Sequence, residues 1–333
     1  MKKYFLQSFI LILLGFIGCN QNNNSNKKAL QSWNEGKSKS EIIDFVNKIT
    51  DEQSKDFIKP SNRVAVFDND GTIWSEKPIY FQFYFAIDRV KELAPKHPEW
   101  KKKEPFKSIL KNDEQAILKH GLDGVLDVLY ATHTGTTVSE FHQIVAKWIQ
   151  TAKHPVKNVP YTNLVFKPML ELLDYLREHE FKVYIVSGGS VEFMRPIISE
   201  IYNIPYEQII GTSFKTEYDY NNGNPVIKRL SDVDFNNDKG GKPVNIQKII
   251  GKKPIFCAGN SDGDLAMMQW TASNSKSSFN IYIHHTDAER EWAYDRNSHV
   301  GKLDKGLDAA KEKGWILVDM KNDWKIIYTF EAK

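Results

Sequence analysis

The sequence predicts an α/β fold, built as a doubly wound parallel sheet with a helical insertion after its first strand. Short apolar segments alternate with segments of helical period, and strands separated by helices are joined in parallel. Residues 64–67 (VAVF) are apolar throughout, which is typical of a strand buried on both faces. Between Trp74 and about Asn163 the spacing is helical, with no convincing strand. The insertion therefore follows the first strand.

The remaining elements can be predicted in chain order from apolar spacing, caps and turn residues. A helix over residues 40–49, with Ser40 as its N-cap, precedes the first strand. The insertion is expected to hold helices over residues 80–93, 113–119, 122–130 and 138–151. The chain then alternates: helix 167–178, strand 182–190, helix from 191, strand 208–211, hairpin around 220–225, helix from 243, strand from 254, helix 265–272, strand 279–285, helix 307–312 and strand 315–320.

Composition limits the classes of protein that the chain can be. Its 333 residues are 41% hydrophobic, enough for a large core. Forty-five basic and 42 acidic residues give a net charge of +3, too balanced to favour a nucleic-acid partner. The sequence has two cysteines, Cys19 and Cys257. Cys257 lies in an apolar segment and is expected to be a small buried core residue.

The first residues form a targeting segment rather than part of the fold. Lys2 and Lys3 precede an apolar run too short for a stable transmembrane helix, and the segment ends at Cys19. It resembles a bacterial lipoprotein signal, which implies cleavage before a lipid-modified Cys19. Residues 1–19 are then the signal peptide and residues 20–37 a flexible polar tether. The alternatives are an ordinary signal peptide and an N-terminal anchor helix.

Three predicted strands end in turns that carry chemically useful residues. The turns are Asp68-Asn69-Asp70-Gly71-Thr72, Ser187-Gly188-Gly189-Ser190 and Gly259-Asn260-Ser261-Asp262-Gly263-Asp264, and Lys242 begins the helix before the third of these strands. Taken singly, they also fit Asx turns, tight turns and a solvated lysine. However, the carboxyl ends of parallel strands meet at one edge of a sheet, where open α/β folds bind ligands. We therefore expect the turns to form one site.

In this order, the three turns and Lys242 resemble the four motifs of the haloacid dehalogenase superfamily, over about residues 63–268. The resemblance is nearest to the phosphoserine-phosphatase-like branch, in which a helical cap lies between the first and second motifs. It implies a Rossmann-like core over residues 38–76 and 162–333, and a cap over residues 77–161. It also implies Mg²⁺ as the cofactor.

Phosphoryl transfer chemistry gives each motif residue a role. It requires a nucleophile, charge neutralisation on the phosphoryl oxygens and a proton for the leaving alkoxide. Asp68 is the candidate nucleophile, and Asp70 the general acid and base. The Ser187 hydroxyl and the N–H groups at Gly188 would hold the phosphate at a helix N-terminus. Lys242 would supply a positive charge that stabilises the negative transition state. The expected Mg²⁺ ligands are Asp68, the main-chain carbonyl of Asp70 and the side chain of Asn260.

Some details of the third turn and its surroundings differ from the family pattern. The family's fourth motif usually begins Gly-Asp, whereas this chain has Gly259-Asn260, so we expect weaker metal affinity and a gain from Asn260→Asp. Asp264 is expected near the metal or holding Lys242, and Asp262 is expected to be a helix N-cap. Phosphoserine phosphatases carry a Glu nine residues after the nucleophile. This chain has Lys77 there, which argues against phosphoserine as substrate.

The sequence thus predicts a membrane-tethered, Mg²⁺-dependent phosphatase that acts on small phosphorylated metabolites. Asp70 favours phosphomonoester hydrolysis, because a leaving halide needs no proton. The predicted location is the bacterial cell envelope, on the periplasmic side, with the lipid anchor as the contact to the membrane. The alternative is a non-catalytic lipoprotein that binds a ligand in the cleft, which only Asn260 favours. His285, Asp287 and Arg290 either line the rim of the site or form a polar turn.

Overall fold

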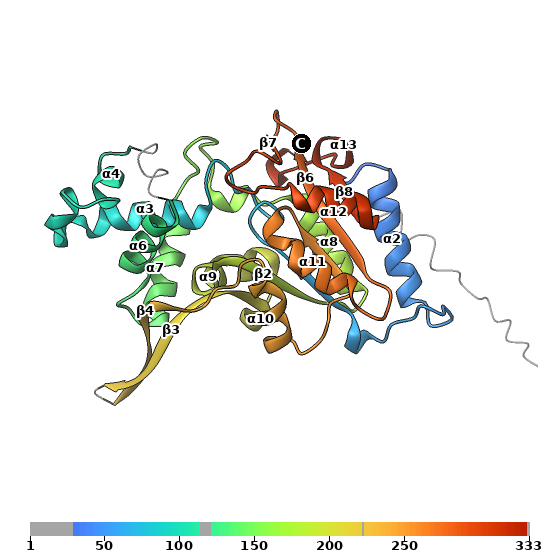
Figure 1. The fold of residues 1–333 in the computed structure, drawn as a ribbon, viewed down its shortest axis with the longest axis horizontal. Helices are drawn as coiled ribbons and strands as arrows, with labels where there is room; N and C mark the ends of the chain where they lie inside the picture. The colour runs from blue at the N-terminus through green and yellow to red at the C-terminus, as the bar shows by residue number, and fades with distance from the viewer. Residues whose placement is uncertain (1–28, 114–120, 222, 332–333) are drawn as a thin grey trace, which may run out of the picture.

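The computed structural model describes residues 29–113, 121–221 and 223–331. Figure 1 shows a sheet flanked by helices at the right and a separate group of helices at the left, with a long hairpin reaching toward that group. Cys19 and nearly all of the helix predicted over residues 113–119 lie outside the described residues. Among the described helices, none combines the length and the apolar character needed to cross a membrane.

A mostly parallel sheet forms the centre of the molecule, which confirms the predicted fold class. Its strand order is β4-β3-β2-β1-β5-β6-β7, with β8 paired to β6. The β3–β4 and β6–β7 pairs are antiparallel, and the other pairs are parallel. The strands are β1 (Val64–Phe67), β2 (Lys182–Ser190), β3 (Ile209–Asn221), β4 (Asn224–Phe235), β5 (Phe256–Gly259), β6 (Phe279–Thr286), β7 (Ala293–Tyr294) and β8 (Ile316–Asp319).

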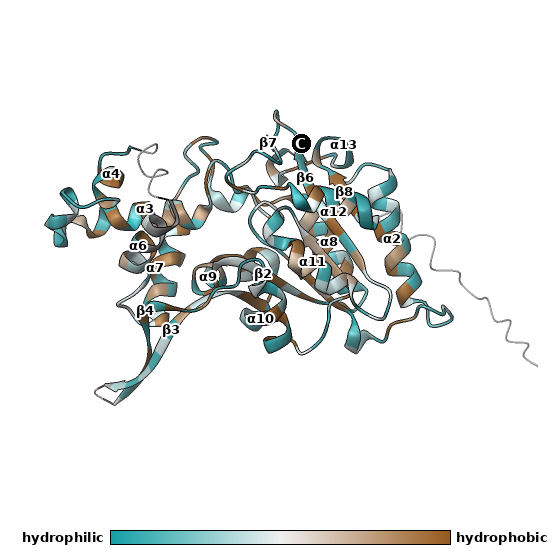
Figure 2. Ribbon diagram, in the orientation of Figure 1, coloured by the Kyte–Doolittle hydropathy of each residue, from teal (hydrophilic) through white to brown (hydrophobic). Residues whose placement is uncertain are grey.

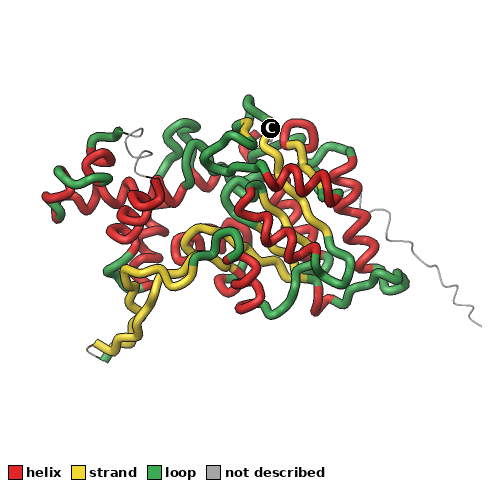
Figure 3. Tube along the Cα trace, in the orientation of Figure 1, coloured by secondary structure: helices red, strands yellow, loops and turns green. Residues whose placement is uncertain are grey.

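The α-helices agree closely with the sequence prediction, as Figure 3 allows the reader to follow. They are α2 (Lys37–Thr50), α3 (Phe81–Leu93), α4 (Phe106–Leu110), α6 (Gly121–His133), α7 (Val138–Thr151), α8 (Lys167–Glu178), α9 (Val191–Tyr202), α10 (Gly241–Ile249), α11 (Leu265–Ala272), α12 (Lys305–Lys313) and α13 (Met320–Asp323). Helices α7, α8 and α11 begin and end at the predicted residues. Their apolar spacing and flanking turn residues were therefore sufficient to define them.

Alternation along the central strands builds two apolar layers. Ala65 and Phe67 of β1 face one layer, and Val64 and Val66 face the other. Residues of α2, α8 and α9 pack in the first layer, and residues of α10, α11 and α12 in the second. Figure 2 shows brown, apolar stripes on these helices where they face the sheet. Because both faces of β1 are covered, its uninterrupted apolar sequence is explained.

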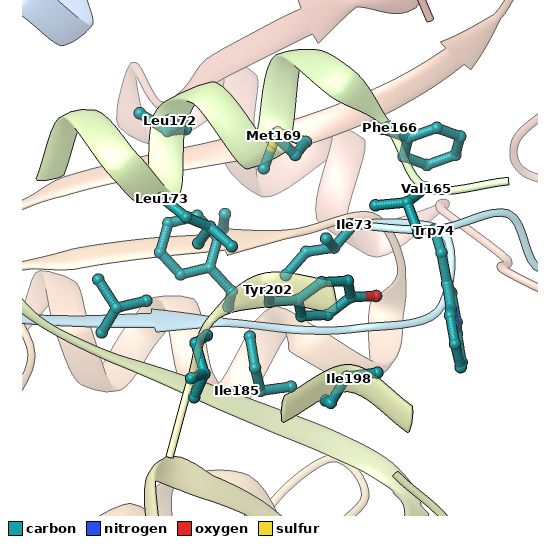
Figure 4. Close-up of a cluster of buried hydrophobic side chains, with 14 of the residues drawn as sticks. Ile73, Trp74, Val165, Phe166, Met169, Leu172, Leu173, Ile185, Ile198 and Tyr202 are labelled. Atoms are coloured by element: carbon teal, nitrogen blue, oxygen red, sulfur yellow. The ribbon is translucent and has the colours of Figure 1, made fainter. Parts of the chain in front are cut away.

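The first layer also packs beneath the turn that follows β1. Figure 4 shows Met169, Leu172 and Leu173 of α8 on one side of this turn, with Ile73 and Tyr202 beside them. The Tyr202 hydroxyl donates a hydrogen bond to Asn69 Oδ1 at 2.9 Å. The apolar core thus holds the first strand-end turn in place from below.

The inserted helices have an apolar core of their own. Phe83, Trp100, Phe106, Ile109 and Val128 belong to a cluster separate from the two layers of the sheet. We call the described part of this group, α3 to α7, the helical lobe. It contacts the main sheet partly through the β3–β4 hairpin, since Arg229 N donates to Thr136 O at 2.9 Å. The predicted boundaries of the core and the cap stay a prediction.

Three local predictions are corrected by the structure. The strand predicted over residues 208–211 continues to Asn221, because pairing with β4 extends it beyond the apolar part of its sequence. The tether predicted over residues 20–37 ends earlier, since Leu30 and Trp33 are buried in the core. Helix α2 begins at Lys37 with Gly36 as N-cap, so Ser40 is not the cap. The Ser40 hydroxyl instead donates to Lys37 O, one turn earlier.

Candidate active site

The site begins where β1 ends. Asp68 follows Phe67 directly, and its N–H donates to Ala258 O of the neighbouring β5 at 2.9 Å. The chain then turns sharply, with Ile73 N donating to Asn69 O at 2.8 Å. Gly71 has a φ of +71°, a conformation that favours glycine. The two strands and this turn place the Asp68 carboxylate, which is 6% exposed, at the carboxyl edge of the sheet.

Lys242 lies between two buried carboxylates. Its Nζ donates to Asp68 Oδ1 and to Asp264 Oδ1, each at 2.6 Å. Burial disfavours the charge on Lys242, but the two carboxylates outweigh it and raise the pKa of the lysine. Burial, followed by repulsion from Asp264, raises the pKa of Asp68 to about 8, although Lys242 opposes this. The predicted contact between Asp264 and Lys242 is therefore present, and it fixes the lysine beside the candidate nucleophile.

Asp70 also lies at this edge, with one oxygen fixed. Its Oδ1 accepts a hydrogen bond from Trp74 Nε1 at 2.7 Å. Burial raises the pKa of Asp70 to about 6, while hydrogen bonds from Trp74 and Ser187 and the charge of Lys242 oppose the rise. A carboxyl group with such a pKa can both donate and accept a proton near neutral pH.

The second turn lies at the N-terminus of a helix, as predicted. β2 ends at Ser190 and α9 begins at Val191. The Ser187 hydroxyl is buried and accepts a hydrogen bond from Gly189 N at 3.0 Å, while Gly188 O accepts one from Thr212 Oγ1 at 2.7 Å. Ser190 N donates to Gln82 Oε1 at 2.8 Å, so α3 of the helical lobe contacts this turn.

The third turn brings Asn260 to the first one. Asn260 Oδ1 accepts from Thr72 Oγ1 at 3.2 Å, and the same hydroxyl lies 3.4 Å from Asp68 Oδ2. Both oxygens therefore lie within reach of the Thr72 hydroxyl, and both are of the kind that a small divalent cation prefers. In the described part of the chain, no group of three or more His, Cys, Asp or Glu side chains is arranged to hold a metal ion. Such a cation would need amide or main-chain oxygens as well.

Asp264 and Asp262 accept hydrogen bonds from different parts of the chain. Asp264 Oδ2 accepts from Asn260 N at 3.0 Å and from Ser261 N at 3.1 Å, which fixes the turn around Lys242. The prediction that Asp262 is the N-cap of the following helix is wrong, since Ser261 has this role for the short 3₁₀ turn that follows it. Asp262 Oδ1 instead accepts from Gly306 N at 2.8 Å, near the start of α12.

Other residues noted in the sequence lie in supporting positions. His285 Nε2 lies 2.7 Å from Gly71 O, so the ring supports the first turn. Arg290 Nε donates to Asp287 Oδ2 at 2.5 Å, the arginine–carboxylate pair of a polar turn rather than a rim of the site. Lys77 Nζ donates to Val300 O at 2.8 Å and so faces the loop after β7.

Sequence reasoning gave no role to several residues that contact the site. Trp74, Thr72, Gln82 and Glu76 each hydrogen-bond a motif residue or its backbone. Glu76 Oε1 accepts from Asn260 Nδ2 at 2.6 Å, and burial raises the pKa of this carboxyl well above its usual range. An acidic residue two positions after the apolar pair Ile73-Trp74 is a weak signal. These contacts join positions far apart in the chain, which no local pattern reveals.

A comparison with protein families identifies the chain. Residues 65–269, more than half of the sequence, match the family model described as haloacid dehalogenase-like hydrolase. The chain belongs to this family. The matched region of this hydrolase runs from β1 to α11 and includes all three strand-end turns and Lys242. The family resemblance expected from the motifs is thereby confirmed.

Solved structures with a related arrangement share little sequence with this hydrolase. A functionally unknown protein from Anaerococcus prevotii has a TM-score of 0.49 and 15% identity, covering 84% of this chain and 92% of that chain. A protein of unknown function from Bordetella pertussis has a TM-score of 0.47 and 13% identity, and the match covers 78% of this chain and 99% of that chain. A phosphoserine phosphohydrolase-like protein from Francisella tularensis has a TM-score of 0.37 and 18% identity, covering 66% and 87%. No curated protein matches the sequence.

Proposed function

We propose that this hydrolase cleaves small phosphomonoesters through an aspartyl-phosphate intermediate. The observation that carries the proposal is the placement of Asp68 and Asp70 at one strand end, with Lys242 Nζ 2.6 Å from Asp68 Oδ1. The Asp68 carboxylate would attack phosphorus, and the leaving alkoxide would take its proton from Asp70. Asp70 would then accept a proton from the water that hydrolyses the intermediate.

The surroundings of the two carboxylates support this division of roles. Asp68 is held by the positive charge of Lys242, which also neutralises charge on the phosphoryl group. Trp74 fixes one oxygen of Asp70, and Ser187 of the phosphate-binding turn also hydrogen-bonds this carboxyl group. The turn at Ser187 and Gly188, at the N-terminus of α9, offers a hydroxyl and N–H groups for the remaining phosphoryl oxygens.

Mg²⁺ is the proposed cofactor. Asp68 Oδ2 and Asn260 Oδ1, with the main-chain carbonyl of Asp70, are the oxygens that would hold it. When bound, the cation supplies positive charge that stabilises the ionised form of Asp68 and the phosphoryl oxygens.

The proposed setting is the bacterial cell envelope. In this proposal, lipid on Cys19 tethers the folded domain to a membrane, and the substrate is a small phosphorylated metabolite. The helical lobe would form part of a cap over the sheet edge, which closes to exclude water and opens to exchange substrate.

The direct test is phosphate release from a panel of small phosphomonoesters, with and without metal. We expect turnover with Mg²⁺, its loss in EDTA and its recovery when excess Mg²⁺ is added. A non-catalytic binding protein would release no phosphate from any member of the panel. Full activity in exhaustively chelated buffer would contradict the proposed cation site.

A further inference from the structure

Glu76 is a buried acid to which the proposed chemistry gives no role. It is 2% exposed and follows the first strand-end turn. Its Oε1 accepts hydrogen bonds from Asn260 Nδ2 at 2.6 Å and from the Tyr294 hydroxyl at 2.8 Å. Glu76 and Asn260 are 184 positions apart in the chain. Burying a carboxyl group is costly, so such a contact needs an explanation.

Two glycines make room for the Glu76 carboxyl group. A Cβ at Gly71 would lie 2.4 Å from Glu76 Oε1 and 2.0 Å from Asn260 Nδ2. A Cβ at Gly301 would lie 1.9 Å from Glu76 Oε1. Both glycines also have positive φ, of 71° and 67°. Two separate segments thus have glycine where they approach the Glu76 carboxyl group. A side chain at position 71 or 301 would collide with Glu76 and disrupt its contact with Asn260.

The contact fixes which end of the Asn260 amide faces the proposed cation. A carboxylate oxygen accepts hydrogen bonds, so it attracts the NH₂ end of an amide and repels the oxygen end. With Nδ2 bonded to Glu76, Asn260 Oδ1 points toward Thr72 Oγ1, 3.2 Å away, and thus toward Asp68. A reversed amide would place two oxygens against each other at Glu76 and an N–H beside Asp68.

The same contact also explains why residue 260 is not an acid. An aspartate at this position would put a second acidic group at hydrogen-bond distance from the buried Glu76, and two carboxylates in such contact repel each other. The Asn260→Asp gain expected from sequence therefore neglects Glu76.

We propose that Glu76 is a positioning residue which orients the Asn260 amide, so that Glu76 and Asn260 act as one unit in metal binding. This inference rests on the proposed function, because it assumes that Asn260 Oδ1 is a cation ligand. Residues that orient metal ligands through hydrogen bonds affect metal affinity by about 10–100-fold. Replacing the Glu76 carboxyl group by an amide, which can present either an oxygen or an NH₂ group to Asn260, or adding a second acid at residue 260, disturbs the same unit.

A double-mutant cycle tests the pair, with Mg²⁺ binding measured by calorimetry on the full chain. We expect Glu76→Gln and Asn260→Asp each to weaken Mg²⁺ binding by about tenfold. In the double variant, the amide introduced at position 76 would donate to the carboxyl group introduced at position 260, so the acid and the amide exchange places and the hydrogen bond is restored with reversed polarity. We expect its Mg²⁺ affinity to return to within about threefold of the wild-type value, a clear departure from additivity.

Controls separate orientation from general stability. Glu171→Gln changes a partly buried acid that hydrogen-bonds Ser32, away from the site, and should leave Mg²⁺ affinity unchanged. Tyr294→Phe removes the second donor to Glu76 Oε1 but keeps the Asn260 contact, so it should weaken Mg²⁺ binding less than Glu76→Gln. Chemical unfolding in EDTA gives a second cycle for the same pair, and the double variant should again be more stable than the sum of the single changes predicts.

The outcomes distinguish this inference from the proposed function. Additive single effects, or no effect of Glu76→Gln on Mg²⁺ binding, would overturn the pairing even if the wild-type protein releases phosphate. Recovery in the double variant supports the pairing even if no phosphomonoester is cleaved, in which case the proposed function alone is wrong. Absence of Mg²⁺ binding by the wild-type protein overturns the pairing as well.

Discussion

The strand-end site and the helical lobe are built in opposite ways. At the site, buried polar side chains from three turns contact one another, and Lys242 joins Asp68 to Asp264 at 2.6 Å each. In the helical lobe, apolar side chains such as Phe83 and Trp100 form a separate core. Gln82 connects the two regions, with Oε1 2.8 Å from Ser190 N and Nε2 3.2 Å from His133 Nε2.

From this difference we expect the strand-end site to determine the chemical step and the helical lobe to determine which substrates bind. A change among the polar contacts of the site should alter the rate of the chemical step. A change in the helical lobe should alter which substrates reach the site, because the lobe can be repacked around its own core. The experiments below are ordered from the largest expected effect to the smallest, and each tests this separation.

The largest effect should come from Asp68→Asn. An amide cannot attack phosphorus, so turnover should fall by about a thousandfold or more for every substrate, with the fold retained. Steady-state phosphate release and circular dichroism on the same preparation measure both. The matched control is Asp262→Asn, which keeps an acceptor for Gly306 N and lies in the third turn.

Retention of more than about a tenth of the wild-type rate by Asp68→Asn would show that another group is the nucleophile. Loss of activity in Asp262→Asn comparable with that in Asp68→Asn would mean that the assay reports stability rather than chemistry.

The second-largest effect should come from Asp70→Asn, and its size should depend on the leaving group of the substrate. Asp70→Asn should lower kcat by about a hundredfold for an alkyl phosphate, which needs a proton, and much less for para-nitrophenyl phosphate. Burial raises the pKa of Asp70 to about 6. The protonated form that acts as acid therefore declines as pH rises through about 6, and so should kcat for the alkyl phosphate. This decline should be absent in the variant, and an unchanged pH profile would argue against Asp70 as the acid.

A smaller effect should distinguish substrates by size. If the helical lobe acts as a lid over the sheet edge, kcat/KM for sugar or amino-alcohol phosphates should exceed that for a phosphorylated folded protein by at least about tenfold. The alternative is a helical lobe that packs aside and leaves an open groove. Measuring kcat/KM for both substrates decides between them, since similar values would exclude a lid.

The smallest effect on turnover should come from the N-terminus. Cys19→Ser should release the protein from membranes while leaving kcat unchanged, because Cys19 is not among the residues proposed to form the site. A chain that begins at Lys28 keeps the buried Leu30 and Trp33 and should be fully active. Fractionation of cells into membrane and soluble pools measures the first expectation, and membrane association equal to that of the wild type would exclude lipid at Cys19 as the anchor.

The sequence predicted most of the fold because its signals are local. The strand at residues 64–67 and helices α7, α8 and α11 were predicted with their observed bounds, since apolar period and turn residues act over a few positions. The site edge was also predictable. Parallel strands place their carboxyl ends together, so Asp68, Ser187 and Asn260 had to lie near one another once the strands were recognised.

Other features were decided only by tertiary contacts. The length of β3 depends on its pairing with β4, and the burial of Leu30 and Trp33 depends on the distant C-terminal segment, where Trp33 pairs with Trp324. Such segments look polar or ambiguous when read alone, because their stabilising partners lie elsewhere in the chain.

By itself, then, the sequence determined the order of strands and helices, the three turns and the types of residue available for phosphoryl transfer. The tertiary structure decided how these residues are oriented. That Lys242 lies between Asp68 and Asp264, and that Glu76 meets the amide of Asn260, depends on contacts between positions 22 to 184 residues apart. The orientation of a buried polar group is set by the hydrogen-bond partners around it, and folding alone brings those partners together.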